Sequence, residues 1–182
     1  MQREMKRVLV LGSGGSGKST FSGKLAKTTG LPLHHLDAHY WRADWVATPE
    51  PQWRERVAAL VGQDEWIIDG SYGGTLDLRI PRADAIFFLD ISKYRCLWNI
   101  LLRRIKYARF TGKSRPGMAP GCQESIWLSF LIWVWRYPVA KKPGVLHAIQ
   151  TQKRTDANVY IFRSYREMDV FLSQLKNGAS ER

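Results

Sequence analysis

The segment Gly12-Ser-Gly-Gly-Ser-Gly-Lys18-Ser19 constrains the fold of this chain more than any other. It matches the pattern G-x-x-x-x-G-K-[S/T] in full, directly after the apolar run Val8–Leu11 and before a helix-compatible stretch. Glycines allow successive backbone N–H groups to converge on a polyphosphate, and the N-terminus of the following helix adds its positive dipole end. The segment therefore predicts a phosphate-binding loop between a strand and a helix, and the binding of a nucleoside triphosphate.

The residues expected to bind ATP lie in this loop and directly after it. The Lys18 side chain is expected to reach the β- and γ-phosphates, and the Ser19 hydroxyl to ligate Mg²⁺. The expected nucleotide contacts are Gly12, Ser13, Gly14, Gly15, Ser16, Gly17, Lys18, Ser19 and Thr20. ATP and Mg²⁺ are therefore the predicted cofactors.

Apolar runs typical of strands alternate with helix-compatible segments along the chain. The runs lie at residues 8–11, 33–36, 66–68, 85–89 and 159–162. Helices are predicted at about residues 18–28, 49–61, 93–110, 123–138 and 165–175. This alternation predicts a parallel sheet covered by helices on both faces. Together with the phosphate loop it indicates the three-layer α/β/α P-loop NTPase fold, with a five-stranded parallel sheet in the order 2-3-1-4-5 and a helical lid insertion.

Two helix boundaries are predicted from individual residues. Thr48 is expected to cap the second helix, with Pro49 in its first position. Pro138 is expected to end the fourth helix, because proline lacks the backbone N–H that a helix interior needs. No helix is predicted between Pro138 and the last strand.

The length of 182 residues suits one domain spanning residues 1–182. The net charge of the chain, +12, favours an anionic partner such as nucleotide phosphates, nucleic acid or an anionic membrane. Eight Lys/Arg and no Asp/Glu lie from Lys93 to Arg115. The longest apolar run, residues 126–135, is too short to span a bilayer, and the N-terminus shows no apolar signal-peptide region. The chain also contains only two cysteines, and together these features favour a cytoplasmic protein.

A P-loop enzyme needs an acidic residue near the loop to organise Mg²⁺, and two residues are candidates. Asp69 and Asp90 each follow an apolar strand. In the predicted strand order the third strand lies beside the loop strand, which favours Asp69, together with Ser19, as the metal residue. The contact of Asp69 with the ion is expected to run through water. Asp90 is expected to be a strand-terminal acid that starts the next helix.

Asp37 follows the second strand, where an acid can face the acceptor hydroxyl or the metal. A turn or helix-capping role is the alternative. Tyr40, Trp41, Trp45 and Trp53 form an aromatic group beside it, suited either to stacking on the acceptor or to packing a helix onto the sheet. Trp41 is the predicted substrate contact.

Histidines around Asp37 also allow a zinc site. His35, Asp37 and His39 would share one face of an extended strand. Zinc is not favoured, because a fourth ligand is lacking nearby and the phosphate loop already explains the site.

Arginines are expected to stabilise the transferring phosphoryl group, whose negative charge is spread over its oxygens. Arg103, Arg109 and Arg115 lie on or just before a basic loop rich in Gly and Pro that can close as a lid. Arg79 and Arg136 are secondary candidates, Arg79 as a substrate contact. After the last strand, Arg163 and Arg166 are candidates for stacking on adenine, Arg163 being the predicted contact.

The segment 126–135 is apolar nearly all round if it is helical. Such a helix is expected to be buried, and three coverings are possible: the core beneath the lid, a second copy of the chain, or a membrane surface.

The chain resembles the adenylate-kinase-like group of small P-loop kinases, on the phosphate loop, Asp69-Gly70 and the arginine-rich helix–loop–helix. The closer resemblance is to the DNA topology modulation proteins, over about residues 6–138. The motifs that carry it are Leu36-Asp37-x-x-x-Trp41, Trp45, Asp69-Gly70-x-Tyr72 and Arg115-Pro116-x-Met118-x-x-Gly121-Cys122-x-Glu124. The resemblance implies a kinase-like domain with an acceptor-side segment at about residues 37–62 and a lid at about residues 103–137.

The chain departs from adenylate kinases where those enzymes bind AMP. Ser71-Tyr72 follows Asp69-Gly70 in place of Phe-Pro-Arg, and His35-Leu36-Asp37 replaces Thr-Gly-Asp. An AMP acceptor is therefore not assumed.

The sequence favours an enzyme that transfers the γ-phosphoryl group of Mg·ATP to a small acceptor: a nucleotide, a nucleoside or another hydroxyl compound. An ATP-binding regulator that acts on DNA topology is the alternative, since a pI near 10 permits nucleic-acid binding, although this is not favoured. A P-loop ATPase or GTPase switch is weaker still. The chain is expected to be a monomer or a homodimer.

Overall fold

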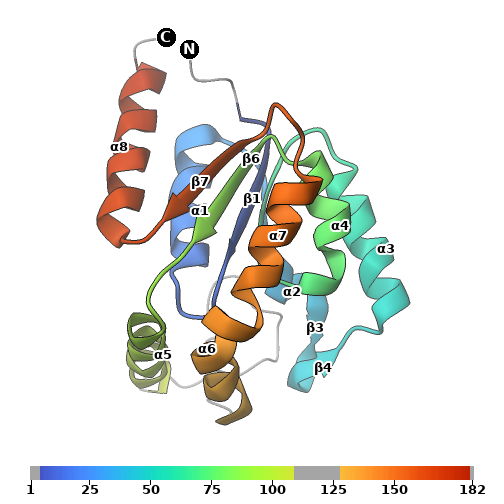
Figure 1. Ribbon diagram of the computed structural model, residues 1–182, viewed down its shortest axis with the longest axis vertical. Coiled ribbons are helices and arrows are strands. Elements are labelled where there is room, and N and C mark those ends of the chain that lie inside the picture. Colours follow the sequence, from blue (N-terminus) through green and yellow to red (C-terminus); the bar gives the residue numbers. More distant parts are fainter. Residues whose placement is uncertain (1–4, 109–127, 181–182) are drawn as a thin grey trace.

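The computed structural model describes residues 5–108 and 128–180, and its centre is a five-stranded, wholly parallel sheet (Figure 1). The sheet order is β2-β5-β1-β6-β7. Its strands are β1 (Arg7–Gly12), β2 (Leu33–His35), β5 (Trp66–Asp69), β6 (Ala85–Leu89) and β7 (Asn158–Phe162). Counted along the chain these five strands have the order 2-3-1-4-5, so the predicted topology is confirmed.

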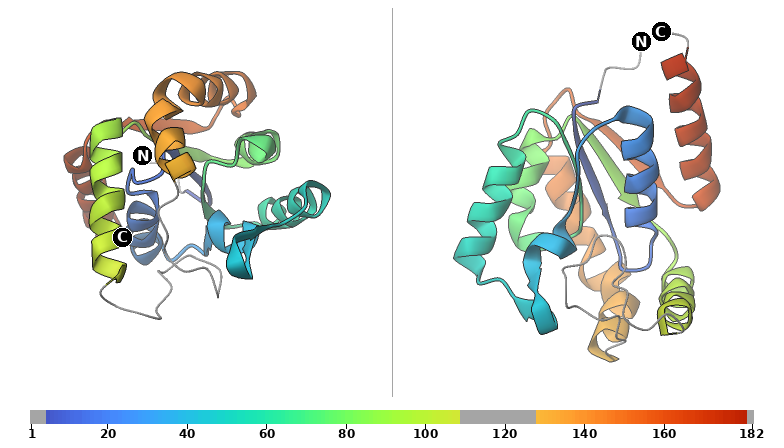
Figure 2. Two further views of the ribbon diagram at one scale, coloured as in Figure 1. Left: turned by 90° about the horizontal axis from the view of Figure 1, so that it is seen from below. Right: turned by 180° about the vertical axis from the view of Figure 1, so that it is seen from behind.

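Helices cover both faces of the sheet. The described helices of four or more residues are α1 (Lys18–Thr29), α2 (Leu36–Tyr40), α3 (Glu50–Val61), α4 (Leu76–Arg79), α5 (Lys93–Ala108), α6 (Leu128–Ala140), α7 (Lys142–Gln152) and α8 (Tyr165–Ser180). Figure 2 shows α3, α4 and α7 on one side of the strands and α1 and α8 on the other. The predicted three-layer α/β/α fold is therefore confirmed.

Alternation along the central strand explains the two layers. Leu9 and Leu11 point into the core that contains α3, α4 and α7, whereas Val8 and Val10 point into the core that contains α1, α5 and α8. Because both faces are covered, all four side chains are fully buried. A strand in this position must be apolar throughout, as the sequence of β1 is.

The start of α3 differs from the prediction. The helix begins at Glu50, with Pro49 rather than Thr48 at its N-cap. The Thr48 hydroxyl instead donates a hydrogen bond to the carbonyl of Tyr40 at 2.6 Å, and the Thr48 N–H donates to the same oxygen at 3.0 Å. Thr48 therefore ties the entrance of α3 to the end of α2.

The structure differs from the predicted elements in three further places. Pro138 lies inside α6, which continues to Ala140, because a proline near the end of a helix removes only one of its last hydrogen bonds. The helix α7 was not predicted, since Pro143 and Gly144 in its first turn are typical of a loop. Leu36, expected in the second strand, is the first residue of α2.

A short antiparallel hairpin follows α2 and carries part of the predicted aromatic group. It consists of β3 (Trp41–Arg42) and β4 (Val46–Ala47). Asp44 and Trp45 in its turn have φ angles of 58° and 60°, in the left-handed region that bulky side chains rarely adopt.

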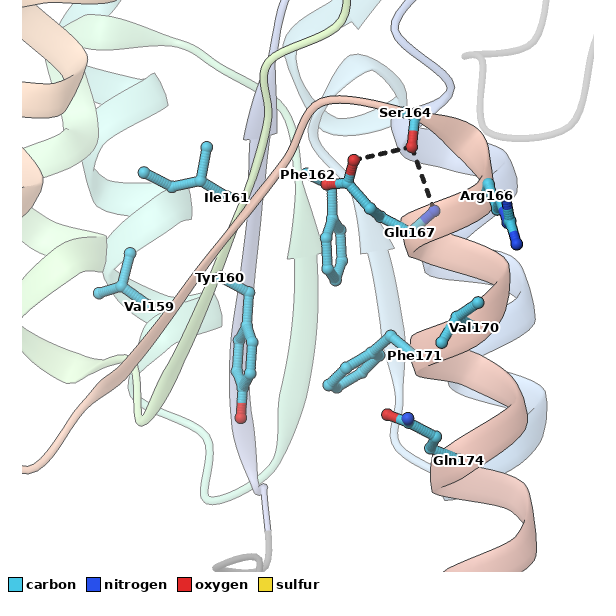
Figure 3. A pocket seen from close by; sticks show the side chains of 10 residues that line it. All are labelled: Val159, Tyr160, Ile161, Phe162, Ser164, Arg166, Glu167, Val170, Phe171 and Gln174. Atoms are coloured by element: carbon cyan, nitrogen blue, oxygen red, sulfur yellow. Dashed lines mark hydrogen bonds between the residues drawn. The ribbon is translucent and has the colours of Figure 1, made fainter.

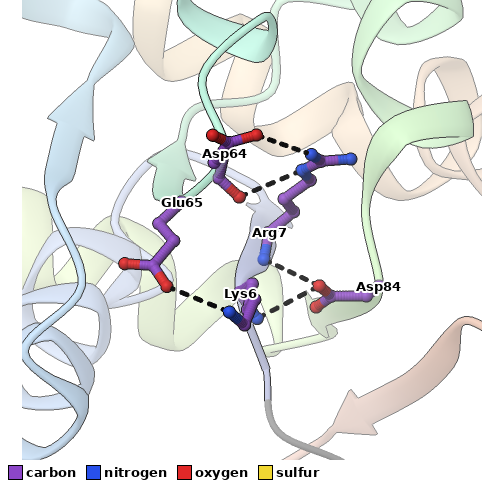
Figure 4. A network of polar contacts seen from close by, with 5 residues as sticks. All are labelled: Lys6, Arg7, Asp64, Glu65 and Asp84. Carbon is purple, nitrogen blue, oxygen red and sulfur yellow. Dashed lines mark hydrogen bonds and ion pairs between the residues drawn. The ribbon is translucent and has the colours of Figure 1, made fainter.

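Charged side chains close the end of the sheet where β1 begins (Figure 4). The Asp84 carboxylate accepts hydrogen bonds from the backbone N–H groups of Lys6 and Arg7, at 3.1 and 2.9 Å. The Arg7 guanidinium pairs with Asp64 at 3.4 Å, and the Lys6 ammonium with Glu65 at 3.5 Å. This network anchors β1 at the end opposite the phosphate loop.

Within residues 5–108 and 128–180, none of the helices combines the length and the apolar character that crossing a bilayer would need.

Candidate nucleotide-binding site

The loop between β1 and α1 has a backbone that only glycine can follow at several positions. Gly12, Gly15 and Gly17 have φ angles of 143°, 75° and 91°. A Cβ atom on Gly15 would lie 2.3 Å from the carbonyl oxygen of Cys96, and one on Gly12 would lie 2.7 Å from that of Leu89. Both approaches are far inside van der Waals contact, so the two glycines are required by neighbouring backbone as well as by φ.

Helices α5, α6 and α8 hold the loop from outside. The Asn99 amide of α5 donates to the carbonyl of Gly15 at 2.8 Å and to the Tyr165 hydroxyl of α8 at 2.6 Å. A Cβ atom on Gly14 would lie only 2.6 Å from the Cζ atom of Phe130 on α6, so this ring packs directly on the loop. These supports were not predicted, and no local motif in the sequence points to them.

Lys18 and Ser19 lie at the start of α1, at the carboxyl end of β1. The Lys18 ammonium donates to the carbonyl of Ser13 at 2.8 Å, which folds its side chain back over the loop. Ser19 and Thr20 are exposed on the first turn of α1. In the described part of the chain, the buried hydroxyls of Ser13 and Ser16 have no hydrogen-bond partner.

The carboxyl ends of the neighbouring strands bring acidic side chains to the same edge as the loop. Asp69 is the last residue of β5, which pairs with β1 so that Val10 lies opposite Asp69. The premise that favoured Asp69, a third strand beside the loop strand, is therefore confirmed. Asp69 is 4% exposed, and its Oδ2 atom lies 2.8 Å from Nδ1 of His35 on β2.

Asp37 and Asp90 lie at the same edge of the sheet, and each has a partner. The Tyr72 hydroxyl donates to Oδ1 of Asp37 at 2.7 Å. Burial raises the pKa of Tyr72, and the Asp37 carboxylate raises it further, so the phenol stays a hydrogen-bond donor. The Lys142 ammonium, at the start of α7, lies 2.7 Å from Oδ2 of Asp90. Because α7 was not predicted, this ion pair was missed.

The chain after β5 is fastened to the phosphate loop. The Ser71 hydroxyl donates to the carbonyl of Gly12 at 2.5 Å. Beneath it, the buried Arg79 guanidinium donates to the carbonyls of Gly70, Ser71, Tyr72 and Thr75, at 2.7 to 3.2 Å.

Arg79 was expected to contact the substrate, but in the structure its side chain is fully buried. Burial lowers its pKa to about 9, which leaves the guanidinium cationic at neutral pH. Its N–H groups donate to carbonyls of residues 70–75, so the structure places Arg79 beneath the site as a support for this segment.

Tyr40 joins the members of the predicted aromatic group, because its ring packs on Trp53 and also meets Trp41 edge to face at 4.9 Å. Tyr40, Trp53 and Tyr72 pack on one another, with ring centroids 4.8 to 5.1 Å apart, and Trp53 is 5% exposed. These three rings fasten α3 to the sheet. Trp41 and Trp45 of the hairpin are half-buried and meet edge to face at 5.5 Å.

The histidines near Asp37 do not assemble a metal site in the described residues, where no three His, Cys, Asp or Glu side chains form a group able to hold an ion. The His34 and His39 rings lie 5.8 Å apart. Burial lowers the pKa of His39, and the neighbouring His34 and Arg56 lower it further.

The predicted arginines fall in different places. Arg103 is half-buried on α5, whereas Arg109 and Arg115 lie outside the described residues. Arg163 is exposed directly after β7, and its backbone N–H donates to Oε2 of Glu167 at 2.9 Å. Glu167 also accepts from the Ser164 hydroxyl at 2.8 Å, and the Glu167 N–H donates to that hydroxyl at 3.3 Å, which caps the start of α8.

A groove of about 590 Å³ lies between β7 and α8 (Figure 3). Tyr160, Ile161, Val170 and Arg166 are among the residues that line it. β7 is the edge strand of the sheet and is separated from β1 by β6. Arg166, the other candidate for stacking on adenine, is exposed on the first turn of α8 and is among the residues that line this groove.

Two solved structures are similar to this chain over nearly its whole length. A shikimate kinase from Acinetobacter baumannii, in complex with shikimate, has a TM-score of 0.56 at 14% identity and covers 98% of this chain and 95% of its own. A shikimate kinase from Bacteroides thetaiotaomicron has a TM-score of 0.51 at 19% identity, with coverages of 97% and 99%. The chain has the fold of these small P-loop kinases. No protein-family model and no curated protein matched the sequence.

Proposed function

We propose that this protein is a kinase that transfers the γ-phosphoryl group of ATP to a hydroxyl group of a small acceptor. The observation that carries the proposal is the convergence of the phosphate loop with Asp37, Asp69 and Asp90 at one edge of the sheet. In phosphoryl transfer the protein mainly positions the reactants and stabilises charge, and this edge offers cations, backbone N–H groups and carboxylates for both tasks.

The donor half of the reaction involves residues 12–20. The loop N–H groups and the Lys18 ammonium would hold the β- and γ-phosphates. The Ser13 and Ser16 hydroxyls, which have no hydrogen-bond partner among the described residues, are further donors beside them. The exposed Ser19 hydroxyl and the Asp69 carboxylate are oxygen ligands of the kind that Mg²⁺ prefers, so the residues present fit this ion. When bound, Mg²⁺ would neutralise phosphate charge. Arg163, exposed after β7, is the proposed contact to adenine.

The acceptor half of the reaction involves the segment 37–62. Asp37 would accept the proton of the attacking hydroxyl or orient it, with the Tyr72 bond fixing the carboxylate. Trp41 lies on the hairpin next to Asp37 and is the proposed contact to the acceptor body. Residues 103–137 are the proposed lid of this single domain, with Arg103, Arg109 and Arg115 as the cations that stabilise the transferring group.

The test is the release of ADP from Mg·ATP across a panel of nucleoside monophosphates, nucleosides and small hydroxyl compounds, shikimate included. We expect one class of acceptor to stimulate release. Lys18→Met should abolish the stimulated rate, because it removes the cation that reaches the β- and γ-phosphates.

Lys24→Met is the matched control, since Lys24 lies on the same helix but pairs with Asp169 on the surface, at 2.7 Å. It should leave the stimulated rate unchanged. ATP binding without stimulation by any acceptor would contradict the kinase. Binding to duplex DNA that weakens steeply with salt would then favour a regulator acting on DNA.

A further inference from the structure

Helices α5 and α6 each expose a straight stripe of large apolar side chains. On α5 the stripe is Tyr94, Trp98, Leu101 and Ile105, and on α6 it is Leu128, Ile132, Trp135 and Val139. Both stripes have the spacing four, three, four, which keeps the side chains of a helix within an arc of about 60°. All eight are between 43% and 85% exposed.

The two stripes belong to one surface. Tyr94, at the start of α5, meets Trp135, near the end of α6, edge to face at 5.6 Å. The two helices lie side by side at the end of the molecule that carries the phosphate loop (Figures 1 and 2). We call the surface formed by the two stripes the α5–α6 face.

The opposite sides of both helices are already used by the fold. Cys96 and Ile100 of α5 and Val134 of α6 are buried in the core beside the phosphate loop. The α6 segment is therefore buried on one side only, and the expectation that it is covered all round does not hold for its outer side. A continuous apolar surface of this kind marks an interaction site.

Charge decides which partner suits the face. Helices α5 and α6 contain six Lys/Arg and no Asp/Glu. The Lys93 ammonium lies 3.7 Å from the ring centre of Trp135, and Arg104 and Arg136 are exposed near the stripes. A second copy would bring the same positive charge against this surface, whereas an anionic surface would neutralise it.

We propose that the α5–α6 face binds the surface of an anionic lipid bilayer. The apolar stripes would enter the boundary between headgroups and acyl chains, and the flanking cations would contact the headgroups. Trp and Tyr suit this depth because their rings are apolar and their tips are polar. The mode is peripheral, with the helices lying in the plane of the bilayer, and it places α5 and α6 between the lipid and the phosphate loop.

The test is co-sedimentation with vesicles, without nucleotide, so that its result is independent of kinase activity. We expect binding to vesicles of phosphatidylcholine mixed with phosphatidylglycerol, weaker binding to phosphatidylcholine alone, and a decrease with salt. The variant with both Trp98→Ser and Ile132→Ser should bind at least about tenfold more weakly, because two large side chains leave the interface. The variant with Arg104→Glu and Arg136→Glu should lose the preference for anionic vesicles.

The matched control carries Ile161→Ser and Val170→Ser, which are 44% and 48% exposed on β7 and α8. It should bind as the unaltered chain does. Thermal unfolding checks that each variant folds. Absence of binding to anionic vesicles, or equal binding by the Trp98 and Ile132 variant, overturns the proposal. The proposal is also overturned if sedimentation velocity shows that the unaltered chain is a dimer and that this variant is a monomer, because a second copy would then cover the face.

Discussion

Nδ1 of His35 lies 2.8 Å from Oδ2 of Asp69, across two parallel strands that are paired in register at these residues. The bond links β2 to β5 at the edge of the sheet where the phosphate loop lies. Asp69 is 4% exposed, so the histidine fixes the orientation of a carboxylate that has little contact with water. A group that orients a metal-binding carboxylate tunes the metal affinity of the site.

The first prediction concerns this bond. His35→Leu removes the partner of Asp69 and should raise the Mg²⁺ concentration at half-maximal ADP release about tenfold or more. His35→Asn, whose amide can donate from nearly the same place, should restore much of the affinity. The Mg²⁺ dependence of thermal stabilisation by ATP provides a readout apart from turnover. An unchanged Mg²⁺ dependence in His35→Leu would show that Asp69 does not organise the ion.

The second prediction compares two glycines. Gly15→Ala places a Cβ 2.3 Å from the carbonyl oxygen of Cys96 at a φ of 75°, so the loop must shift. We expect a loss of about 2 kcal/mol or more in the free energy of unfolding and a loss of ATP binding. Gly23→Ala, in the middle of α1 with nothing within 4 Å of the new Cβ, should instead stabilise the chain by about 0.5–1 kcal/mol.

Chemical denaturation and ATP titration measure both variants. Normal ATP binding by Gly15→Ala would mean that α5 does not press on the loop as the structure shows.

The parts of the fold that follow from local patterns were predictable. A phosphate loop after an apolar run determines β1 and α1, and the alternation of strands and helices determines a parallel sheet. The strand order then puts Asp69 beside the loop without any knowledge of side-chain contacts.

Contacts between distant segments were not predictable in this way. Asn99 reaches a carbonyl 84 residues earlier and a hydroxyl 66 residues later, and neither partner leaves a trace in the sequence near Asn99. Lys142 was missed with α7, because Pro143 and Gly144 mask the start of that helix. Arg79 follows Asp69-Gly70 in the chain and was expected to contact the substrate, and only its burial reveals the supporting role.

The third prediction tests that role. Arg79→Met leaves four backbone carbonyls without their donor in a buried place, and should lower the free energy of unfolding by about 3 kcal/mol or more. Arg79→Lys should lose less, since an ammonium can bond to some of these oxygens. Arg82→Met, on the exposed side of the next turn, should change stability by about 0.5 kcal/mol at most. Urea denaturation measures all three variants, and equal stability of the Met variants would contradict the assignment.

The fourth prediction concerns the thiol of Cys96, whose own carbonyl borders Gly15. Burial raises its pKa from 9.0 to about 11, although the nearby Lys18 opposes the shift. A higher pKa means less thiolate at pH 8, and the difference of about 2 between these pKa values makes the reactive fraction about a hundredfold smaller than in an unfolded chain.

Alkylation by iodoacetamide measures this, in a Cys122→Ser background so that one thiol is counted. At pH 8 the folded chain should react at least about a hundredfold more slowly than the chain in urea, because low accessibility adds to the low thiolate fraction. The rate in the folded chain should rise as the pH approaches 11, since the thiol then ionises. Equal rates at pH 8 with and without urea would mean that α5 is not seated against the phosphate loop, which would also remove the support of Gly15 by Asn99.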